Sequence, residues 1–487
     1  MLQIPVDLKV IRRNMNSSDF KTLEEKSSDI SKEMFQLMEE LFPICRSITG
    51  NGVRKTLEII KKHISLETHE IPSGTKVYDW TIPKEWNIQD AYIIDPNGEK
   101  IVDFRKSNLH VVNYSIPINQ KISLSELKKH IHVIPEKPDL IPYVTSYYSE
   151  NWGFCMSHNQ FLGLKEGEYH VVIDSKLDNG SLTYGEYLIP GKSEDVILLS
   201  CYVCHPSMCN DNLSGVVLLT MLAKYMQNFK NNYSIRFLFI PETIGAITWL
   251  HINEKNIFKI KHGLVATCLG DSGFLTYKKT RNNDEEIDKT VENILKKSGI
   301  KFRVLDFFPW GSDERQFSSP GFNLPVGSLF RSIYGSSEFP EYHTSGDNLN
   351  FMSMKSLAES FVTYLLVLFE LENNFHLHLQ NNKSNISKNL KNQNENKTSE
   401  SDKYLNLNPK CEPQLGKRGI YHQIGGQEST MKQRKIEFAI FWILNLSDGN
   451  NTIQDISKRS GISLEDLQIS IKILINSKLL KKIEKSN

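Results

Sequence analysis

The sequence predicts an α/β fold: a mostly parallel sheet covered by helices, with an inserted β-rich domain and a C-terminal winged helix. Within 187–375, near-continuous apolar segments alternate with helical patterns, which is typical of a parallel sheet covered on both faces. Two hairpin signatures mark a β-rich stretch before this region. Three helical patterns and a short β segment then close the chain in the order of a winged helix.

Composition sets the broad class of the protein. The chain has 487 residues, a formal net charge of +1 and seven cysteines. This length allows roughly two to four domains, and the near-zero charge gives no argument for nucleic acid or an anionic membrane as partner. No apolar run approaches the roughly 20 residues of a transmembrane helix. We see no secretory signal, so we expect a cytoplasmic protein with reduced thiols and no membrane association.

Residues 1–75 are predicted to form the first part of the main domain. Apolar side chains recur at helical spacing in 30–42, and a second helical pattern covers 53–63, so we expect two helices there. The first 30 residues are mixed and charged, and we expect them to lie at the periphery of the fold.

Residues 76–186 are predicted to form the inserted β-rich domain. Short β-rich runs flank a Pro-Asn-Gly turn at 96–98 and an Asp-Asn-Gly turn at 178–180, and both are hairpin signatures. An aromatic-rich stretch lies between the two hairpins. We expect its rings to pack within this domain, with the lining of a substrate entrance as the alternative; they belong to Tyr147, Tyr148, Trp152 and Phe154.

Residues 187–375 are predicted to complete the main domain and to carry the metal site. Between about 298 and 350 we expect loops. The predicted strands cover 196–200, 235–240 and 264–269, and the predicted helices cover 213–229, 244–253, 289–297 and 354–372.

The segment 376–410 is predicted to be a flexible linker. It is rich in Asn, Lys and Ser, with almost no large apolar residue before Tyr404. Such a segment buries too little apolar surface to offset the entropy that ordering would cost.

Residues 411–487 are predicted to form the winged helix, with helices at 434–446, 453–459 and 464–476 and a wing strand at 479–484. The helix that would read DNA begins with Glu465 and Asp466, whose charges would repel phosphates. We therefore do not expect DNA as a partner. We favour contact with a protein or the substrate, or formation of a homo-oligomer through this unit.

Three consecutive predicted strands end in residues that can carry chemistry. The first strand is followed by His205 and Asp211, the second by Glu242 and the third by Asp271. The carboxyl ends of parallel strands meet at one edge of a sheet, where ligands bind, so these side chains should converge. His343 lies on a loop further along the chain. Two imidazoles with several carboxylates suit zinc, which takes N and O ligands at about 2.0–2.2 Å.

The order of these residues resembles that of the zinc aminopeptidases built on an α/β sheet. Asp211 stands in Asn-Asp-Asn-Leu-Ser-Gly, similar to the motif of their metal-bridging Asp. Glu242 stands in Pro-Glu-Thr-Ile-Gly-Ala, where those enzymes carry the general base. Asp313 completes a Ser-Asp pair like theirs. His343, in Tyr-His-Thr with Asp347 four residues on, matches their final ligand motif.

This resemblance covers 187–375. With the inserted domain and the winged helix, the whole chain is similar to a bacterial family of aminopeptidase-like proteins, some of which are labelled polysaccharide-biosynthesis proteins. The resemblance implies that Glu242 is the general base and that Asp313 and Asp347 orient ligands or loops from behind the site. The metal ligands that it implies are His205, Asp211, His343 and Asp271.

The chain departs from that pattern in ways that leave one or two zinc ions open. Thr243 follows the predicted base, where the two-zinc enzymes carry a second Glu, and Asp271 is offset by a few residues. If a single zinc ion binds, the two histidines and Asp211 hold it, with Asp271 or Glu242 as a further ligand.

The sequence therefore predicts a zinc-dependent aminopeptidase-like hydrolase that cleaves an N-terminal amide bond in a small peptide or an aminoacyl conjugate. One alternative is single-zinc chemistry like that of glutaminyl cyclases. The other is a non-catalytic regulator that binds a ligand and uses the winged helix, an alternative that Thr243 in place of an acid keeps open.

Overall fold

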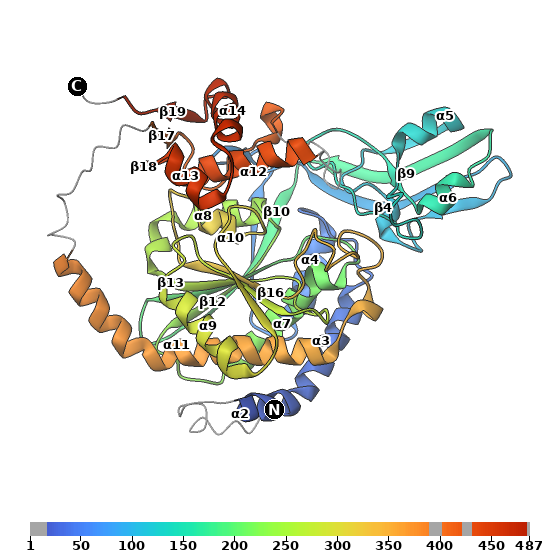
Figure 1. Cartoon of the computed structure of the whole chain (residues 1–487). Helices are drawn as coiled ribbons and strands as arrows, with labels where there is room; N and C mark the ends of the chain where they lie inside the picture. Colours follow the sequence, from blue (N-terminus) through green and yellow to red (C-terminus); the bar gives the residue numbers. More distant parts are fainter. Residues whose placement is uncertain (1–16, 389–401, 421–430, 485–487) are drawn as a thin grey trace.

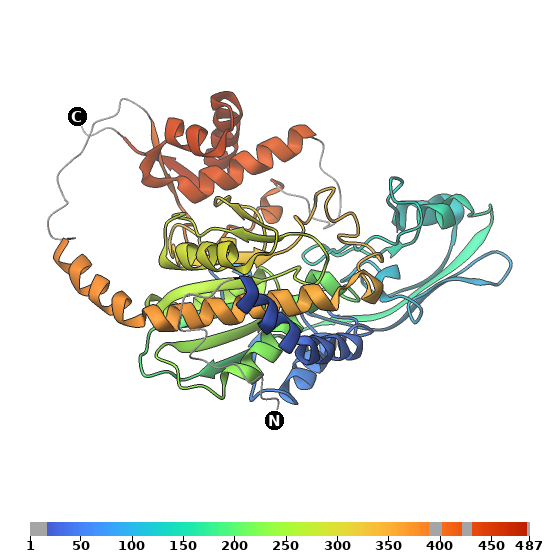
Figure 2. The same ribbon diagram turned by 60° about the horizontal axis from the view of Figure 1, so that its bottom comes forward.

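The computed structural model describes residues 17–388, 402–420 and 431–484 (Figure 1). Its centre is a mixed sheet with helices on both faces. The inserted domain extends from the sheet as an arm, and the C-terminal unit lies against one side of the main domain (Figures 1 and 2). The α/β fold with an inserted β-rich region and a terminal winged helix is confirmed.

The main sheet contains four adjacent parallel strands, with antiparallel strands beyond them on both sides. In β11 and β12, Tyr202 lies beside Ile240, so these two strands end at the same level. The loops that follow them therefore emerge side by side. The strands in spatial order are β1 (Glu67–Pro72), β10 (Ser181–Ile189), β12 (Ser234–Ile240), β11 (Val196–Tyr202), β13 (Ile260–Ala266), β16 (Val326–Phe330), β14 (Leu275–Lys278) and β15 (Phe302–Leu305).

Helices cover this sheet on both faces, and α7 is buried along almost its whole length because its residues are apolar nearly all round. The core on one face includes residues of α2 (Ser17–Lys26), α3 (Ser28–Leu41), α4 (Asn51–Lys61), α7 (Ser214–Met226), α9 (Glu286–Ser298) and α11 (Met354–Lys388), with α2 packed on α3, α9 and α11. The other face packs against α8 (Ile244–Asn253) and the short α10 (Glu314–Phe317).

Several expectations for the main domain need correction. Where loops were expected, β15 and β16 add two strands to the sheet. Helix α2 is not peripheral, because Phe20 and Leu23 are buried in the main core; the expectation for 1–16 lies outside the described residues. The predicted second hairpin is also wrong, since β10 pairs with β1 and β12 of the main sheet.

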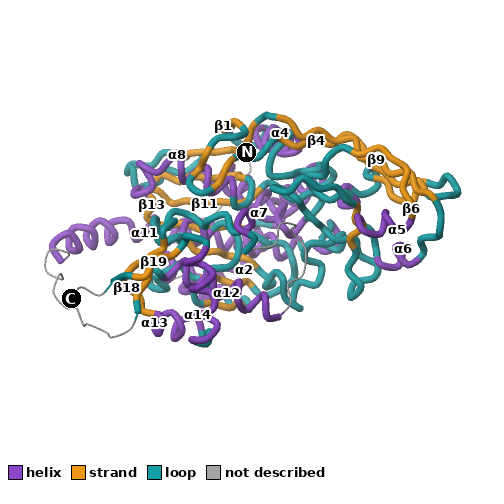
Figure 3. The backbone as a smooth tube through the Cα atoms, turned by 90° about the horizontal axis from the view of Figure 1, so that it is seen from above, coloured by secondary structure: helices purple, strands orange, loops and turns teal. Residues whose placement is uncertain are grey.

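The inserted domain is built on an antiparallel sheet of four strands in the order β5-β4-β9-β6. The predicted hairpin at 96–98 is confirmed: β4 and β5 are antiparallel, and Gly98 adopts a positive φ of 85° in the turn. In Figure 3 this domain points away from the main sheet. Its elements are β2 (Lys76–Val77), β3 (Trp80–Thr81), β4 (Glu85–Ile94), β5 (Lys100–Asp103), β6 (Ile118–Ser123), α5 (Leu124–Leu127), β7 (Ile131–His132), β8 (Phe154–Cys155), α6 (His158–Leu162) and β9 (Glu168–Asp178).

The C-terminal unit combines three helices with a three-stranded sheet in the order β18-β17-β19. Strand β17 falls inside the segment expected to be a linker, because Tyr404 and Asn406 alternate inward and supply the buried face of a strand. Residues 389–401 of that segment lie outside the described residues. The elements are β17 (Lys403–Asn406), α12 (Met431–Leu446), β18 (Asp448–Thr452), α13 (Ile453–Ser460), α14 (Leu464–Asn476) and β19 (Leu480–Lys482).

The C-terminal unit is fixed to the main domain by polar contacts. Arg281, which follows β14, donates from Nε to Asn445 Oδ1 and from a terminal nitrogen to Asn445 O, each at 2.9 Å. Asp448 also lies within ion-pair distance of Arg281. The described part of the chain contains no helix long and apolar enough to cross a membrane.

Candidate metal centre

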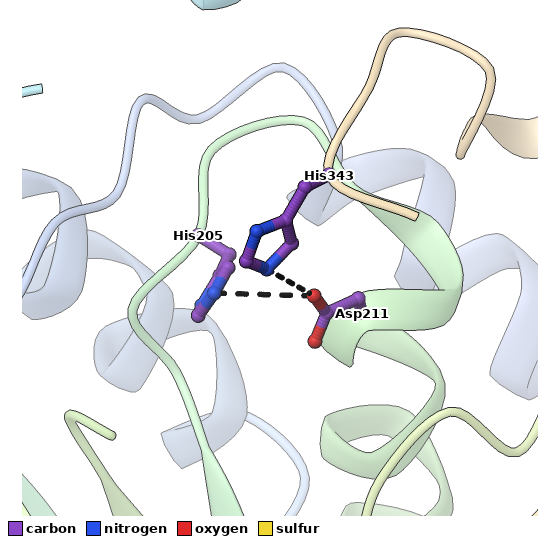
Figure 4. Close-up of side chains that lie close together, drawn as sticks. All are labelled: His205, Asp211 and His343. Carbon is purple, nitrogen blue, oxygen red and sulfur yellow. Dashed lines mark ion pairs between the residues drawn. The ribbon is translucent and has the colours of Figure 1, made fainter. Parts of the chain in front are cut away.

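Three side chains from distant parts of the sequence meet at the carboxyl end of the parallel strands (Figure 4). His343 Nε2 lies 3.0 Å from Asp211 Oδ2, and His205 Nε2 lies 3.9 Å from the same oxygen. One potential ligand atom from each residue lies within 4.8 Å of the others. The structure therefore brings together three of the four predicted metal ligands.

The loop after β11 orients His205. His205 Nδ1 lies 2.9 Å from the carbonyl oxygen of Cys204. A proton on Nδ1 can be donated to this oxygen, and Nε2 then faces Asp211 with a free lone pair. The backbone of His205 has a positive φ of 77°, and the buried Arg46 donates from Nε to the His205 carbonyl at 3.0 Å. Burial lowers the pKa of Arg46 to about 10, so this guanidinium stays charged at neutral pH.

Asp211 is buried in an irregular turn between β11 and α7. Its Oδ1 accepts a hydrogen bond from Tyr202, whose hydroxyl also lies 2.7 Å from Thr267 Oγ1. Burial acts to raise the pKa of Asp211, but the adjacent imidazoles of His205 and His343 outweigh it and hold that pKa at about 2. The carboxylate is therefore ionised.

Asp347 holds this turn in place from behind. Its two carboxylate oxygens accept hydrogen bonds from the backbone nitrogens of Asn210 and Asp211, at 2.6 and 2.8 Å. Asp347 is itself buried and does not belong to the metal-ligand group found among the described residues. The orienting role of Asp347 stays a prediction, and these two hydrogen bonds are the contacts through which it would act.

The three converging residues fit a zinc ion by their chemistry. Asp211 Oδ2 and His343 Nε2 are both buried and lie 3.0 Å from each other, and neither has a hydrogen-bond partner elsewhere among the described residues. Buried polar atoms normally have all their partners, and a shared metal ion would supply the missing one to both atoms. Two imidazoles and a carboxylate are ordinary zinc ligands.

Asp271 lies outside this group, although it was predicted to be a ligand. Its Oδ2 accepts from the side-chain amide of Asn210 at 2.9 Å, and its Oδ1 accepts from Ser332 Oγ and Gly273 N, each at 2.6 Å. Strand β13 ends at Ala266, five residues before Asp271, and the Asp271 carboxylate connects loops beside the site instead of joining the three ligands.

Glu242 follows β12 and faces the metal group. Its Oε2 lies 3.8 Å from His205 Nε2, and its Oε1 accepts a hydrogen bond from Ser312 at 3.0 Å. Burial raises the pKa of Glu242, and the nearby charge of His205 opposes that rise. A raised pKa brings a carboxylate closer to the range in which it can both take up and release a proton.

The backbone next to Glu242 is held in an uncommon conformation. Thr243 has a φ of 62°, which is strained for a β-branched residue. Its N–H donates to the buried Asp313 Oδ1 at 2.7 Å. Asp313 therefore stabilises the turn that presents Glu242. Burial, reinforced by the charge of Glu242, raises the pKa of Asp313 well above its usual range.

A cavity of about 390 Å³ opens onto this group. This volume lies within the usual range of small-molecule sites, about 300–1,000 Å³. Tyr147 and Tyr148 of the inserted domain line it, whereas Trp152 and Phe154 pack in the core of that domain. The lining residues are Ile48, Trp80, Tyr143, Thr145, Tyr147, Tyr148, Cys204, His205, Glu242, Thr243, Ile244, Arg315, His343, Glu412, Gln414, Leu415, Gly416 and Lys417.

Sequence reasoning missed Tyr202, Arg315 and the C-terminal lining residues. Tyr202 is the last residue of the buried strand β11. Its position in the sequence relative to Asp211 does not indicate that its hydroxyl donates to that carboxylate. The segment 412–417 lies more than 60 residues beyond His343 in a region without a motif. Only the folded chain reveals these contacts.

Tyr202→Phe is expected to weaken zinc binding by about 10- to 100-fold, the usual cost of removing a group that orients a ligand. The ring would still fill its buried position, but Asp211 Oδ1 would lose the hydrogen bond from Tyr202. Competition with a chelating dye measures the affinity. An unchanged zinc affinity in a normally folded variant would contradict the orienting role.

The comparisons with known proteins agree with this fold. Residues 35–374 match the family described as Domain of unknown function (DUF4910), and 402–482 match a winged helix-turn-helix family. A Clostridium acetobutylicum protein is 55% identical over 457 residues, which cover 94% of this chain and 98% of that protein. It is named as a candidate polysaccharide biosynthesis protein with an aminopeptidase-like domain.

Solved structures give the same result. The crystal structure of a candidate peptidase from Clostridium acetobutylicum is 52% identical, with a TM-score of 0.71, and the match covers 96% of this chain and all of that chain. A zinc aminopeptidase from Bacillus subtilis is 12% identical, with a TM-score of 0.52 over 70% of this chain and 94% of that one. This second likeness concerns the fold alone.

Proposed function

The chain belongs to the DUF4910 family, and from this premise we propose that it is a zinc-dependent hydrolase. Its reaction would be the cleavage of an N-terminal amide bond in a small peptide or an aminoacyl conjugate. The observation that carries the proposal is the group of His205, Asp211 and His343, with the carboxylate of Glu242 3.8 Å from His205 Nε2.

The two imidazoles and the carboxylate of Asp211 would hold one zinc ion. Zinc, when bound, supplies Lewis acidity toward the carbonyl group of an amide. The protein residues do the remaining work. Glu242 would take a proton from the attacking water and pass it to the leaving amine. Ser312 fixes one oxygen of that carboxylate, which leaves the other to face the site.

A single ion is the stoichiometry that the geometry favours. In the described part of the chain, only one group of three or more possible ligands comes together. Thr243 stands next to Glu242 and offers a hydroxyl where a second acid would be needed, and Asp271 is engaged elsewhere. Because glutaminyl-cyclase-like chemistry also uses a single zinc ion, that chemistry is the second candidate. Hydrolysis remains the first, since one zinc ion and the Glu242 base are sufficient to cleave an amide.

Metal analysis combined with a substrate screen tests the proposed function. We expect about one zinc ion per chain, hydrolysis of some member of a panel, loss of activity with a chelator and recovery with added zinc. The panel would contain aminoacyl amides, dipeptides and aminoacyl amides of amino sugars, the last because of the name of the Clostridium acetobutylicum relative.

Product analysis separates the two candidates. Cyclisation of an N-terminal Gln releases ammonia and no free amino acid, whereas hydrolysis at the N-terminus releases an amino acid. A purified protein that contains no zinc and cannot be loaded with it would contradict both.

A further inference from the structure

The segment 409–418 links β17 to the rest of the C-terminal unit and runs along the edge of the cavity; we call it the strap. Its residues Glu412, Gln414, Leu415, Gly416 and Lys417 line the cavity together with Glu242 and both histidines. The C-terminal unit therefore contributes directly to the site, although it follows the catalytic residues by a long stretch of chain.

Contacts with the edge of the inserted domain hold one side of the strap. Asp79 lies in the turn between β2 and β3, and its carboxylate accepts from the backbone of Gln414 at 2.8 Å and from Lys417 Nζ at 2.9 Å. Arg418 also pairs with Asp79, at 2.5 Å. The indole nitrogen of Trp80 donates to the carbonyl oxygen of Glu412 at 2.7 Å.

Contacts with the region around α10 hold the other side. The Arg315 guanidinium lies 2.9 Å from the Glu412 carboxylate, and it also donates to Thr243 Oγ1 at 3.2 Å. Gln316 Oε1 accepts a hydrogen bond from the backbone nitrogen of Glu412 at 2.9 Å. The strap thus connects through one arginine to the residue beside Glu242.

One strap side chain has the properties of a ligand-binding group. Gln414 is only 9% exposed and lines the cavity, yet its side-chain amide has no hydrogen-bond partner in the structure as described. The hydrogen bonds of this residue involve only its backbone. Its amide atoms are not among the fully buried polar atoms that lack a partner, so the amide is accessible from the cavity, where it offers both a donor and an acceptor to a bound molecule.

We propose that Gln414 is a specificity-determining residue that hydrogen-bonds a polar group of the substrate beyond the reacting amide. This inference rests on the proposed function and deepens it: the preferred substrates would be those whose leaving part carries a further amide or a similar group. The strap then both attaches the C-terminal unit to the main and inserted domains and lines the side of the cavity that contacts the substrate.

Calorimetry with two ligands tests this role without depending on turnover. The zinc-loaded Glu242→Gln variant would be titrated with the tripeptide Leu-Gly-Gly and with leucine amide, which has no polar group beyond the reacting amide. Adding Gln414→Leu is expected to weaken tripeptide binding by about three- to tenfold, the loss typical of one hydrogen bond, and to leave leucine amide binding unchanged.

Lys410→Gln is the matched control, because Lys410 lies in the same strap and pairs with Glu254 but does not line the cavity. It should leave both affinities unchanged. Gln414→Ala provides the same comparison if the Leu variant does not fold. The role of Gln414 is overturned if Glu242→Gln binds both ligands and the added Gln414→Leu leaves the ratio of the two affinities unchanged. Zinc-loaded Glu242→Gln that binds neither ligand would instead count against the proposed function.

Discussion

Glu242→Gln is expected to lower kcat by about 10²- to 10⁴-fold, the usual contribution of a general base, while leaving zinc in place. The amide has nearly the shape of the carboxylate and can still accept the hydrogen bond from Ser312. It cannot take a proton from water at neutral pH. The three side chains that converge in the structure do not include Glu242, so the metal content should remain at about one ion per chain.

Turnover and metal content must therefore be measured on the same preparation. Glu254→Gln is a suitable control, because Glu254 pairs with Lys410 and lies outside the cavity. It should change neither quantity. If Glu242→Gln loses its zinc together with its activity, Glu242 is a ligand and the role assigned to it is wrong.

The main convergence at the site follows from local sequence features. His205 and Glu242 follow β11 and β12, which are parallel and end level, so their positions after apolar strands were sufficient to predict that they lie close together. His343 could be predicted only from its motif, because no strand precedes it directly and its loop approaches Asp211 from far along the chain.

Other parts of the structure depend on contacts that a local pattern does not contain. Asp271 lies in a loop five residues beyond the end of β13, and its carboxylate bonds to Asn210 and Ser332, which are distant in sequence. Strand β10 follows the hairpin signature Asp-Asn-Gly at 178–180, yet it pairs with β1 and β12. A pattern gives the face that a strand buries, whereas the choice of partner is made by the whole fold.

The strap shows the same limit at the level of function. Gln414 stands in a stretch without periodicity or motif, and its place at the cavity results from the pairing of Asp79 with Lys417 and Arg418. Those pairs join residues more than 330 positions apart. The pattern of helices and strands after residue 411 predicts a winged-helix fold. It contains no sign that the strap in front of these helices lines the cavity of the main domain.

Asp211→Asn is expected to abolish stable zinc binding and, with it, the activity. Asp211 is the carboxylate on which both histidines converge, because its Oδ2 lies 3.0 Å from His343 Nε2 and 3.9 Å from His205 Nε2. The Asn side chain keeps the shape of the turn, whose backbone Asp347 would still hold, but it removes the negative charge that balances a divalent cation. Metal analysis after gel filtration should find almost no zinc, and circular dichroism should show an intact fold.

Asp271→Asn is the informative comparison for that variant. Both residues are buried acids that follow strands of the same sheet edge, and both were predicted to be ligands. Because the Asp271 oxygens are taken up by Asn210, Gly273 and Ser332, its replacement should lower thermal stability and retain the zinc. If Asp271→Asn lost its zinc and Asp211→Asn kept it, Asp271 and not Asp211 would be the ligand. The cation would then lie beside Asp271, on the opposite side of Asn210 from the two histidines.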